Sequence, residues 1–214
     1  MFATGHTPGT PEFGRVIVLA SLGGPSAVTT VVAGLSADYP VPIVVVQHRR
    51  RTPDDRDPLT AILSQRTSLP VRLAEHGAPA DQFGVTVVPA ETAASFDESG
   101  RWRLIESRTA MRPGDGLLLS SAHRTPTVAV ILTGSLNDGA DGCRAVKRAG
   151  GRVLVQDPTT ARSSSMPANA IATGCADFVL PLDRIPSALL ALTTAPGAAD
   201  LLAVPLPPWA RLSS

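Results

Sequence analysis

The sequence contains only two cysteines, Cys143 and Cys175, in 214 residues. They form no disulfide framework, and their spacing matches no metal-binding motif. We therefore expect two buried free thiols in a reducing compartment, with a disulfide between them as the open alternative. No other feature of the sequence requires a metal.

An excess of charge of one sign is also missing. The chain has 19 Lys and Arg against 18 Asp and Glu, which gives a net charge of +1. No general field therefore attracts nucleic acid or an anionic membrane, and we expect no nucleic-acid partner. The run from His48 to Arg51 is a local basic exception.

Long apolar segments are absent. No run approaches the roughly 20 apolar residues that cross a bilayer, and residues 1–14 lack the basic and apolar regions of a secretory signal. We expect a cytoplasmic protein without membrane insertion. Residues 1–14, rich in Gly, Thr and Pro, are predicted to be a flexible tail, and residues 194–214 a Pro-rich C-terminal tail.

Apolar residues make up 43% of the chain, enough for a substantial core, and we predict one domain over residues 15–193. Short apolar runs alternate with segments of helical spacing, which is typical of a parallel sheet. The predicted strands cover residues 15–20, 41–46, 71–74, 84–89, 127–132, 153–155 and 178–180. The predicted helices cover residues 26–37, 59–68, 117–122, 140–149, 166–173 and 185–192. Gly100 in a polar stretch indicates a hairpin.

This pattern predicts the α/β class: a doubly wound, mostly parallel sheet with helices on both faces and a small antiparallel hairpin at its edge. In such sheets, ligands bind beyond the carboxyl ends of the strands. Ser21 follows the first predicted strand, His48 follows the second, and Asp138 lies in the loop after residues 127–132. A hydroxyl, an imidazole and a carboxylate at one sheet edge are what acyl transfer by a serine requires.

Each of these residues alone also has an ordinary structural interpretation. Ser21 precedes Gly23 and Gly24, and such a sequence is commonly only a turn. His48 could be a surface residue, and Asp138 sits in a glycine-containing loop. Their coincidence at one edge favours the catalytic interpretation. The turn at Ser21 would also place backbone N–H groups at a helix N-terminus, where they can stabilise an oxyanion.

Four segments, in order along the chain, resemble the catalytic domain of the CheB protein-glutamate methylesterases. Ala20–Pro25 is similar to the A-S-T-G-G-P of that family, and Val45–His48 is similar to its V-V-Q-H. Ile131–Gly142 is similar to its L-T-G-M-G-x-D-G-A-x-G, and Ser165–Pro167 keeps its Met-Pro pair. The resemblance extends over residues 15–192.

The resemblance implies a serine esterase that hydrolyses glutamyl methyl esters on the cytoplasmic helices of methyl-accepting chemotaxis receptors. Some members also deamidate glutamines. Ser21 would be the nucleophile, His48 the general base and Asp138 the orienting carboxylate. The backbone N–H groups of Leu22 and Ser135 would form the oxyanion hole. The family needs neither a metal nor an organic cofactor.

Gly23, Gly24, Arg49 and Met166 are added as candidate substrate-binding residues, because they lie in or next to the matching segments. Arg49, with the two arginines that follow it, could meet acidic receptor helices, or this run could be a solvated loop. The phosphoreceiver domain that usually precedes the catalytic domain has no counterpart in residues 1–14. We therefore expect any regulator to act in trans.

The sequence departs from the family pattern at three places. Leu22 replaces a threonine, Ser135 and Leu136 replace Met-Gly, and residues 91–93 replace a His-Leu pair. Leucine has less backbone freedom than glycine, so Leu136 could change the shape of the loop.

Two other functions compete with the esterase. The first is a binding or regulatory module of a signalling pathway that uses the same cleft without catalysis; retention of all three catalytic residue types favours the enzyme. The second is a nucleotide-binding domain. It is disfavoured because Leu22-Gly23-Gly24 does not follow the G-x-G-x-x-G pattern and no suitable acidic residue follows the second strand.

Overall fold

A computed structural model of the chain describes residues 13–52, 57–107, 112–122, 126–195 and 197–198. Its main element is a seven-stranded sheet with the strand order β3-β4-β2-β1-β7-β8-β9, in which all neighbouring strands are parallel. The strands are β1 (Arg15–Ala20), β2 (Ile43–Gln47), β3 (Val71–Leu73), β4 (Val85–Val87), β7 (Thr127–Ile131), β8 (Arg152–Gln156) and β9 (Phe178–Leu180).

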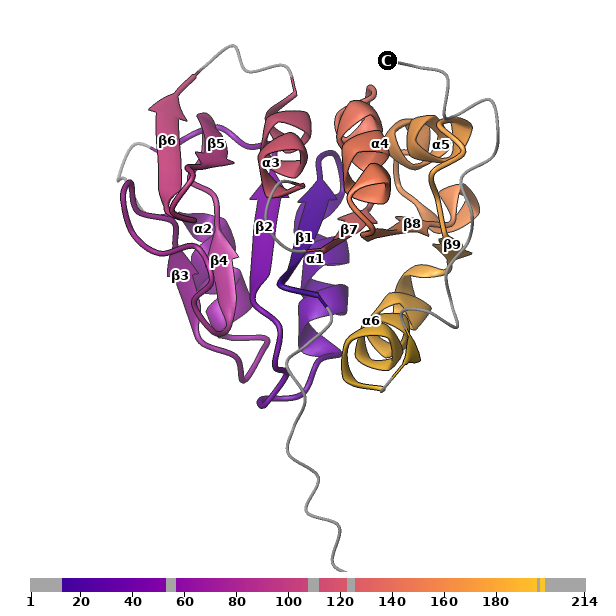
Figure 1. Ribbon diagram of the computed structural model, residues 1–214, viewed down its shortest axis with the longest axis horizontal. Coiled ribbons are helices and arrows are strands. Elements are labelled where there is room, and N and C mark those ends of the chain that lie inside the picture. Colours follow the sequence, from indigo (N-terminus) through magenta and orange to yellow (C-terminus); the bar gives the residue numbers. More distant parts are fainter. Residues whose placement is uncertain (1–12, 53–56, 108–111, 123–125, 196, 199–214) are drawn as a thin grey trace, which may run out of the picture.

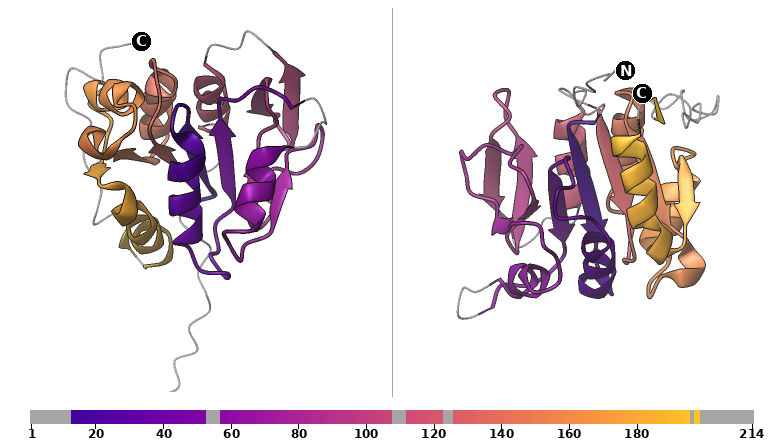
Figure 2. Two further views of the ribbon diagram at one scale, coloured as in Figure 1. Left: turned by 180° about the vertical axis from the view of Figure 1, so that it is seen from behind. Right: turned by 90° about the horizontal axis from the view of Figure 1, so that it is seen from below.

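Helices connect the strands and cover both faces of the sheet. They are α1 (Gly24–Ala33), α2 (Pro58–Ser64), α3 (Pro113–Ser121), α4 (Ala140–Arg148), α5 (Ser165–Ala172) and α6 (Ile185–Thr194), with short 3₁₀ helices η1 (Pro158–Thr160) and η2 (Leu182–Arg184). One core joins the sheet to α1, α2 and α6, and the other joins it to α3, α4 and α5. Figure 1 shows α3 and α4 in front of the sheet, and Figure 2 shows α1 and α2 on the other side.

The central strand β1 shows why the fold forms. Its six residues are all buried, and they alternate between the two cores: Val16 and Val18 face α1, whereas Ile17 and Leu19 face α3. A strand buried on both faces is a continuous apolar run, as the sequence indicated. The predicted fold class is confirmed.

The predicted hairpin is formed by β5 (Thr92–Phe96) and β6 (Trp102–Glu106), which pair in antiparallel fashion. These two strands make a separate sheet. Phe96 and Trp102 pack together, with ring centroids 4.9 Å apart, and join the core on the α3 side. The hairpin therefore packs against α3 at one end of the sheet.

Three predicted helix boundaries were wrong by four residues. The helix expected over residues 59–68 ends at Ser64. The helix expected over residues 26–37 ends at Ala33, and Gly34 follows as its C-cap. Gly34 lets α6 pack closely, since a Cβ there would lie 2.7 Å from Cβ of Pro186. The helix expected from Leu117 begins at Pro113. Its two early glycines disfavour a helix in isolation, and contacts from another loop, described below, stabilise its first turn.

The two predicted tails lie mostly outside the described residues. Both cysteines are free and buried, as expected, and burial raises the pKa of the Cys143 thiol. None of the described helices is long and apolar enough to cross a membrane.

A buried ion pair fixes one side of the sheet. Lys147 at the end of α4 pairs with Asp177, whose side chain is 0% exposed, and Asp177 also accepts a hydrogen bond of 2.8 Å from the backbone N–H of Val153. The pair ties α4 and the first residues of β8 to the loop before β9. Removal of one partner would leave the other charge buried and unpaired.

Lys147→Met is therefore expected to lower the free energy of unfolding by about 3 kcal/mol or more, measured by denaturant titration. The double variant Lys147→Met/Asp177→Asn is the matched control. It removes both charges and keeps an acceptor for Val153, so it should recover much of the loss. Equal stability of the single variant and the wild type would contradict this account of the pair.

Candidate active site

The parallel register brings the ends of three strands together. Ala20 of β1 is level with Gln47 of β2, and Leu19 is level with Ile131 of β7. Hydrogen bonds continue this alignment beyond the strands, from the His48 N–H to the Ala20 carbonyl (3.2 Å) and from the Ser21 N–H to the Thr133 carbonyl (3.0 Å). Ser21, His48 and the loop containing Asp138 thus meet at one edge, as the sequence predicted.

The imidazole of His48 contacts the carboxylate of Asp138. The distance from Nε2 to Oδ2 is 2.8 Å, and the Asp138 side chain is 2% exposed, against 28% for His48. A carboxylate can only accept, so Nε2 carries the proton. Nδ1 then keeps its lone pair and can act as a base.

The first turn of α3 holds the Asp138 carboxylate. The Gly114 N–H donates to Oδ2 and the Asp115 N–H donates to Oδ1, each at 2.9 Å. In the first turn of a helix, these N–H groups have no partner inside the helix, and the positive end of the helix dipole lies there. Both features favour an anion such as the Asp138 carboxylate. With His48, the carboxylate has three donors, which fix its orientation.

Gly114 is required by this close approach. A Cβ at this position would lie 2.8 Å from Oδ2 of Asp138 and 2.6 Å from Cδ1 of Leu19. This role of Gly114 was not predicted from the sequence, because the helix was expected to begin four residues later. The proline at the first helical position was the available signal.

A second carboxylate lies next to the first. Asp115 is buried and accepts a 2.7 Å hydrogen bond from the Gly142 N–H. Burial raises the pKa of the Asp115 carboxyl, the negative charges of Asp138 and Asp141 add to this, and the Gly142 hydrogen bond opposes it. Asp115 thus joins α3 to α4 beneath the His48–Asp138 pair.

Ser21 lies on the turn between β1 and α1. Gly23 makes this turn with φ of +82°, and the Ser21 carbonyl accepts from the Gly24 N–H (2.8 Å) and from Nε2 of Gln47 (3.2 Å). The side chain faces the loop after β7, since a Cβ on Gly134 would lie 2.9 Å from Cβ of Ser21. The position of Ser21 is therefore anchored by both neighbouring strands.

The backbone N–H groups of Leu22 and Ser135 donate to no acceptor among the described residues. The N–H of Thr133, by contrast, is bound to Oε1 of Gln156 at 2.9 Å, and that of Gly134 to the Ser163 carbonyl at 3.0 Å. The two donors expected in the oxyanion hole are thus available for a ligand, whereas their neighbours hold the loop in place.

Leu136 adopts a left-handed backbone with φ of +69°, the region that a glycine occupies freely. For leucine this costs about 1–2 kcal/mol. Hydrogen bonds to its carbonyl from Nδ2 of Asn169 (2.8 Å) and Oγ of Ser165 (3.1 Å) offset the strain. Leu136 is therefore compatible with a left-handed conformation in this loop, and its side chain is 64% exposed beside the site.

Two candidate substrate-binding residues lie elsewhere than expected. The Arg49 side chain is 10% exposed; its guanidinium pairs with Asp57 and donates to the Gln47 and Val88 carbonyls at 3.0 and 2.8 Å. Met166 is 1% exposed, with Sδ 2.1 Å from a Cβ built on Gly134. Internal contacts hold both side chains. Met166 supports the site from inside the protein, and Arg49 also lines the pocket that contains His48.

The glycines of the turn have a related role. Gly24 is buried, and a Cβ there would lie 2.9 Å from Cγ of Gln47 and 3.0 Å from Cβ of Ala20. Gly24 therefore allows close packing of the turn. Gly23 lies under the side chain of Arg162.

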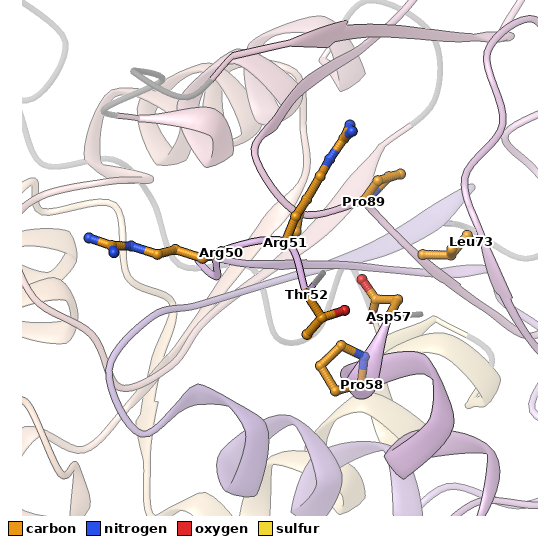
Figure 3. A pocket seen from close by; sticks show the side chains of 8 residues that line it. Arg50, Arg51, Thr52, Asp57, Pro58, Leu73 and Pro89 are labelled. Carbon is orange, nitrogen blue, oxygen red and sulfur yellow. The ribbon is translucent and has the colours of Figure 1, made fainter. Parts of the chain in front are cut away.

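Two pockets adjoin the site. The first, of about 200 Å³, includes His48 and reaches Glu91, Thr92, Ser107 and Pro113. The second, of about 180 Å³, lies farther along the loop after β2 and contains neither Ser21 nor His48. Figure 3 shows Arg50 and Arg51 diverging at its rim, with Thr52 and Asp57 below them. Arg51 pairs with Glu106 at 2.7 Å.

Among the described residues, no group of three or more His, Cys, Asp or Glu side chains is arranged to hold a metal ion. The chemistry that the arrangement itself offers is that of a hydroxyl, an imidazole oriented by a buried carboxylate, and two backbone donors.

The chain is similar to proteins of a known family. Residues 16–189 match the family described as CheB methylesterase. A protein of Anaeromyxobacter dehalogenans named protein-glutamate methylesterase/protein-glutamine glutaminase 2 is 40% identical over 187 residues, covering 83% of this chain and 53% of that protein. Protein-glutamate methylesterase FrzG of Myxococcus xanthus is 34% identical over 185 residues, covering 84% and 55%.

A solved structure is also similar. The crystal structure of the Thermotoga maritima CheB methylesterase catalytic domain superposes with a TM-score of 0.76 at 33% identity, covering 84% of this chain and 99% of that one. The chain spans about half the length of the relatives from Anaeromyxobacter dehalogenans and Myxococcus xanthus. The likeness thus extends over a catalytic domain.

Proposed function

The chain belongs to the CheB methylesterase family, and from this premise we propose that it hydrolyses glutamyl methyl esters by acyl transfer through Ser21. The observation that carries the proposal is the 2.8 Å contact between Nε2 of His48 and the buried Asp138 carboxylate, at the same sheet edge as Ser21. An oriented imidazole beside a serine is the arrangement that activates a hydroxyl.

The reaction proceeds in two halves. Nδ1 of His48 takes the Ser21 proton while Oγ attacks the ester carbonyl carbon, and the N–H groups of Leu22 and Ser135 stabilise the oxyanion. The imidazolium, stabilised by Asp138, then gives its proton to the departing methanol. Water attacks the resulting acyl-enzyme with the help of the same base, and the product is a glutamate side chain.

The same steps would act on a glutamine amide, with ammonia as the leaving group. The relative from Anaeromyxobacter dehalogenans is named as both methylesterase and glutaminase. We therefore propose glutamine deamidation as a second reaction of the same site. The substrates would be the cytoplasmic helices of methyl-accepting chemotaxis receptors, and we propose a cytoplasmic location for the same reason.

The test is methanol release from a methylated receptor fragment that a known family member is shown to cleave. We expect release by the wild type and progressive inactivation by phenylmethylsulfonyl fluoride, with the sulfonyl group found on the peptide containing Ser21 by mass spectrometry. Absence of release would instead favour a binding module. Labelling of another serine would refute the assignment of the nucleophile.

A further inference from the structure

A rigid loop places Arg162 over the turn of the nucleophile. Its neighbour Ser163 is bound to the loop after β7 by several hydrogen bonds. Among them, the Ser163 N–H donates to Oγ1 of Thr133 (2.9 Å), its Oγ donates to the Gly134 carbonyl (3.1 Å), and its carbonyl accepts from the Gly134 N–H (3.0 Å). Oγ1 of Thr133 also donates to the Leu22 carbonyl at 2.9 Å. The Arg162 backbone is therefore fixed relative to Ser21.

The aliphatic part of the Arg162 side chain lies on Gly23, two residues after Ser21. A Cβ on Gly23 would be 2.8 Å from Cβ and 3.1 Å from Cδ of Arg162. Arginine commonly lays its stem on a surface in this way while the guanidinium stays in water, and Arg162 is indeed exposed. The contact restricts the stem, so less rotamer freedom remains to be lost on binding a ligand.

The guanidinium of Arg162 makes no hydrogen bond or ion pair with any residue in the described part of the chain. The acids around the site have other partners: Asp138 accepts from His48, and Asp141 pairs with Arg112 and Arg144 at 2.8 and 3.1 Å. Arg162 therefore offers a fork of donors suited to a carboxylate from outside.

We propose that Arg162 binds a carboxylate of the substrate segment, on the Gly23 side of the reacting ester, and so makes an acidic neighbour a determinant of specificity. This inference rests on the proposed function of the Ser21 site. On a helical substrate, residues three or four positions from the ester share its face, so the preferred substrate carries an acidic residue at one of those positions.

The test compares two helical peptides that contain one glutamyl methyl ester. One has glutamate three and four residues on either side of the ester, and the other has glutamine at those positions. With the wild type, kcat/KM is expected to be roughly tenfold higher for the acidic peptide. In Arg162→Gln, KM for the acidic peptide should rise to that for the neutral peptide, while kcat stays within twofold.

The charge-reversal variant Arg162→Glu should prefer a third peptide with lysine at the same positions, and salt should weaken the wild-type preference. The control is Arg184→Gln, another exposed arginine, which lies in the short helix η2 that contacts α1. It should keep the wild-type preference. An equal KM change on both peptides, or a fall in kcat, would overturn the proposal.

Binding measurements separate this inference from the proposed function. The same peptides are titrated against Ser21→Ala, which would not consume the ester, and against Ser21→Ala/Arg162→Gln. Tighter binding of the acidic peptide that depends on Arg162 would support the inference even if the wild type released no methanol. Equal affinities for the two peptides would refute it, whatever the activity of the wild type.

Discussion

Ser21→Ala is expected to reduce methanol release by about 10⁴-fold or more, because the variant has no oxygen to form the acyl-enzyme. Turnover would fall to what the oxyanion donors and substrate binding support alone. Peptide affinity should remain, since Leu22 and Ser135 would contribute their backbone rather than their side chains to the site. The measurement is steady-state methanol release at saturating peptide, together with peptide titration.

Ser26→Ala is the matched control for this substitution. Ser26 lies in the first turns of α1, is exposed and makes no side-chain hydrogen bond with the described residues, so activity should stay within twofold of the wild type. Residual activity of Ser21→Ala within tenfold of the wild type would show that another group attacks the ester.

The sequence was sufficient for the parts of the site that depend on strand position. The buried runs that became β1, β2 and β7 ended where Ser21, His48 and the Asp138 loop began, and parallel pairing brought those ends together. Such runs are recognisable because a strand buried on both faces tolerates few polar residues.

The parts that the sequence could not supply depend on contacts between distant segments. The first turn of α3 is stabilised by Asp138, which is 24 residues away from Gly114. Helix propensity disfavours a start in Pro-Gly-Asp-Gly, so local reasoning placed the helix too late.

The orientation of individual side chains and loops could also not be predicted from the sequence. Arg49 follows His48 directly, which suggested a substrate contact, yet Asp57 and two carbonyl groups turn it inward. Whether Leu136 changes its loop was also left open by the sequence; its carbonyl accepts two hydrogen bonds from α5 that stabilise the left-handed backbone. In both cases the deciding partners lie in other elements of the fold.

Asp138→Asn is expected to lower kcat by about 10⁴-fold with little change in peptide affinity. The amide of asparagine has one acceptor, whereas the carboxylate accepts from His48, Gly114 and Asp115. If the asparagine oxygen takes the N–H of Asp115, its NH₂ group faces Nε2 of His48. The imidazole must then accept at Nε2 and carry its proton on Nδ1, so it can no longer take the proton of Ser21.

Either orientation of the amide places the NH₂ group against a backbone donor, which is the Gly114 N–H in the first case and the Asp115 N–H in the opposite one. Each costs about 1–3 kcal/mol for an unsatisfied buried donor. The free energy of unfolding should therefore fall modestly together with the activity, and denaturant titration measures this loss of stability.

Asp141→Asn is the control: it makes the same chemical change in the first turn of α4, where the side chain is 55% exposed and pairs with Arg112 and Arg144. Its kcat should stay within threefold of the wild type. Comparable losses in the two variants would mean that the charge of this region, rather than the hydrogen bond to His48, determines the rate.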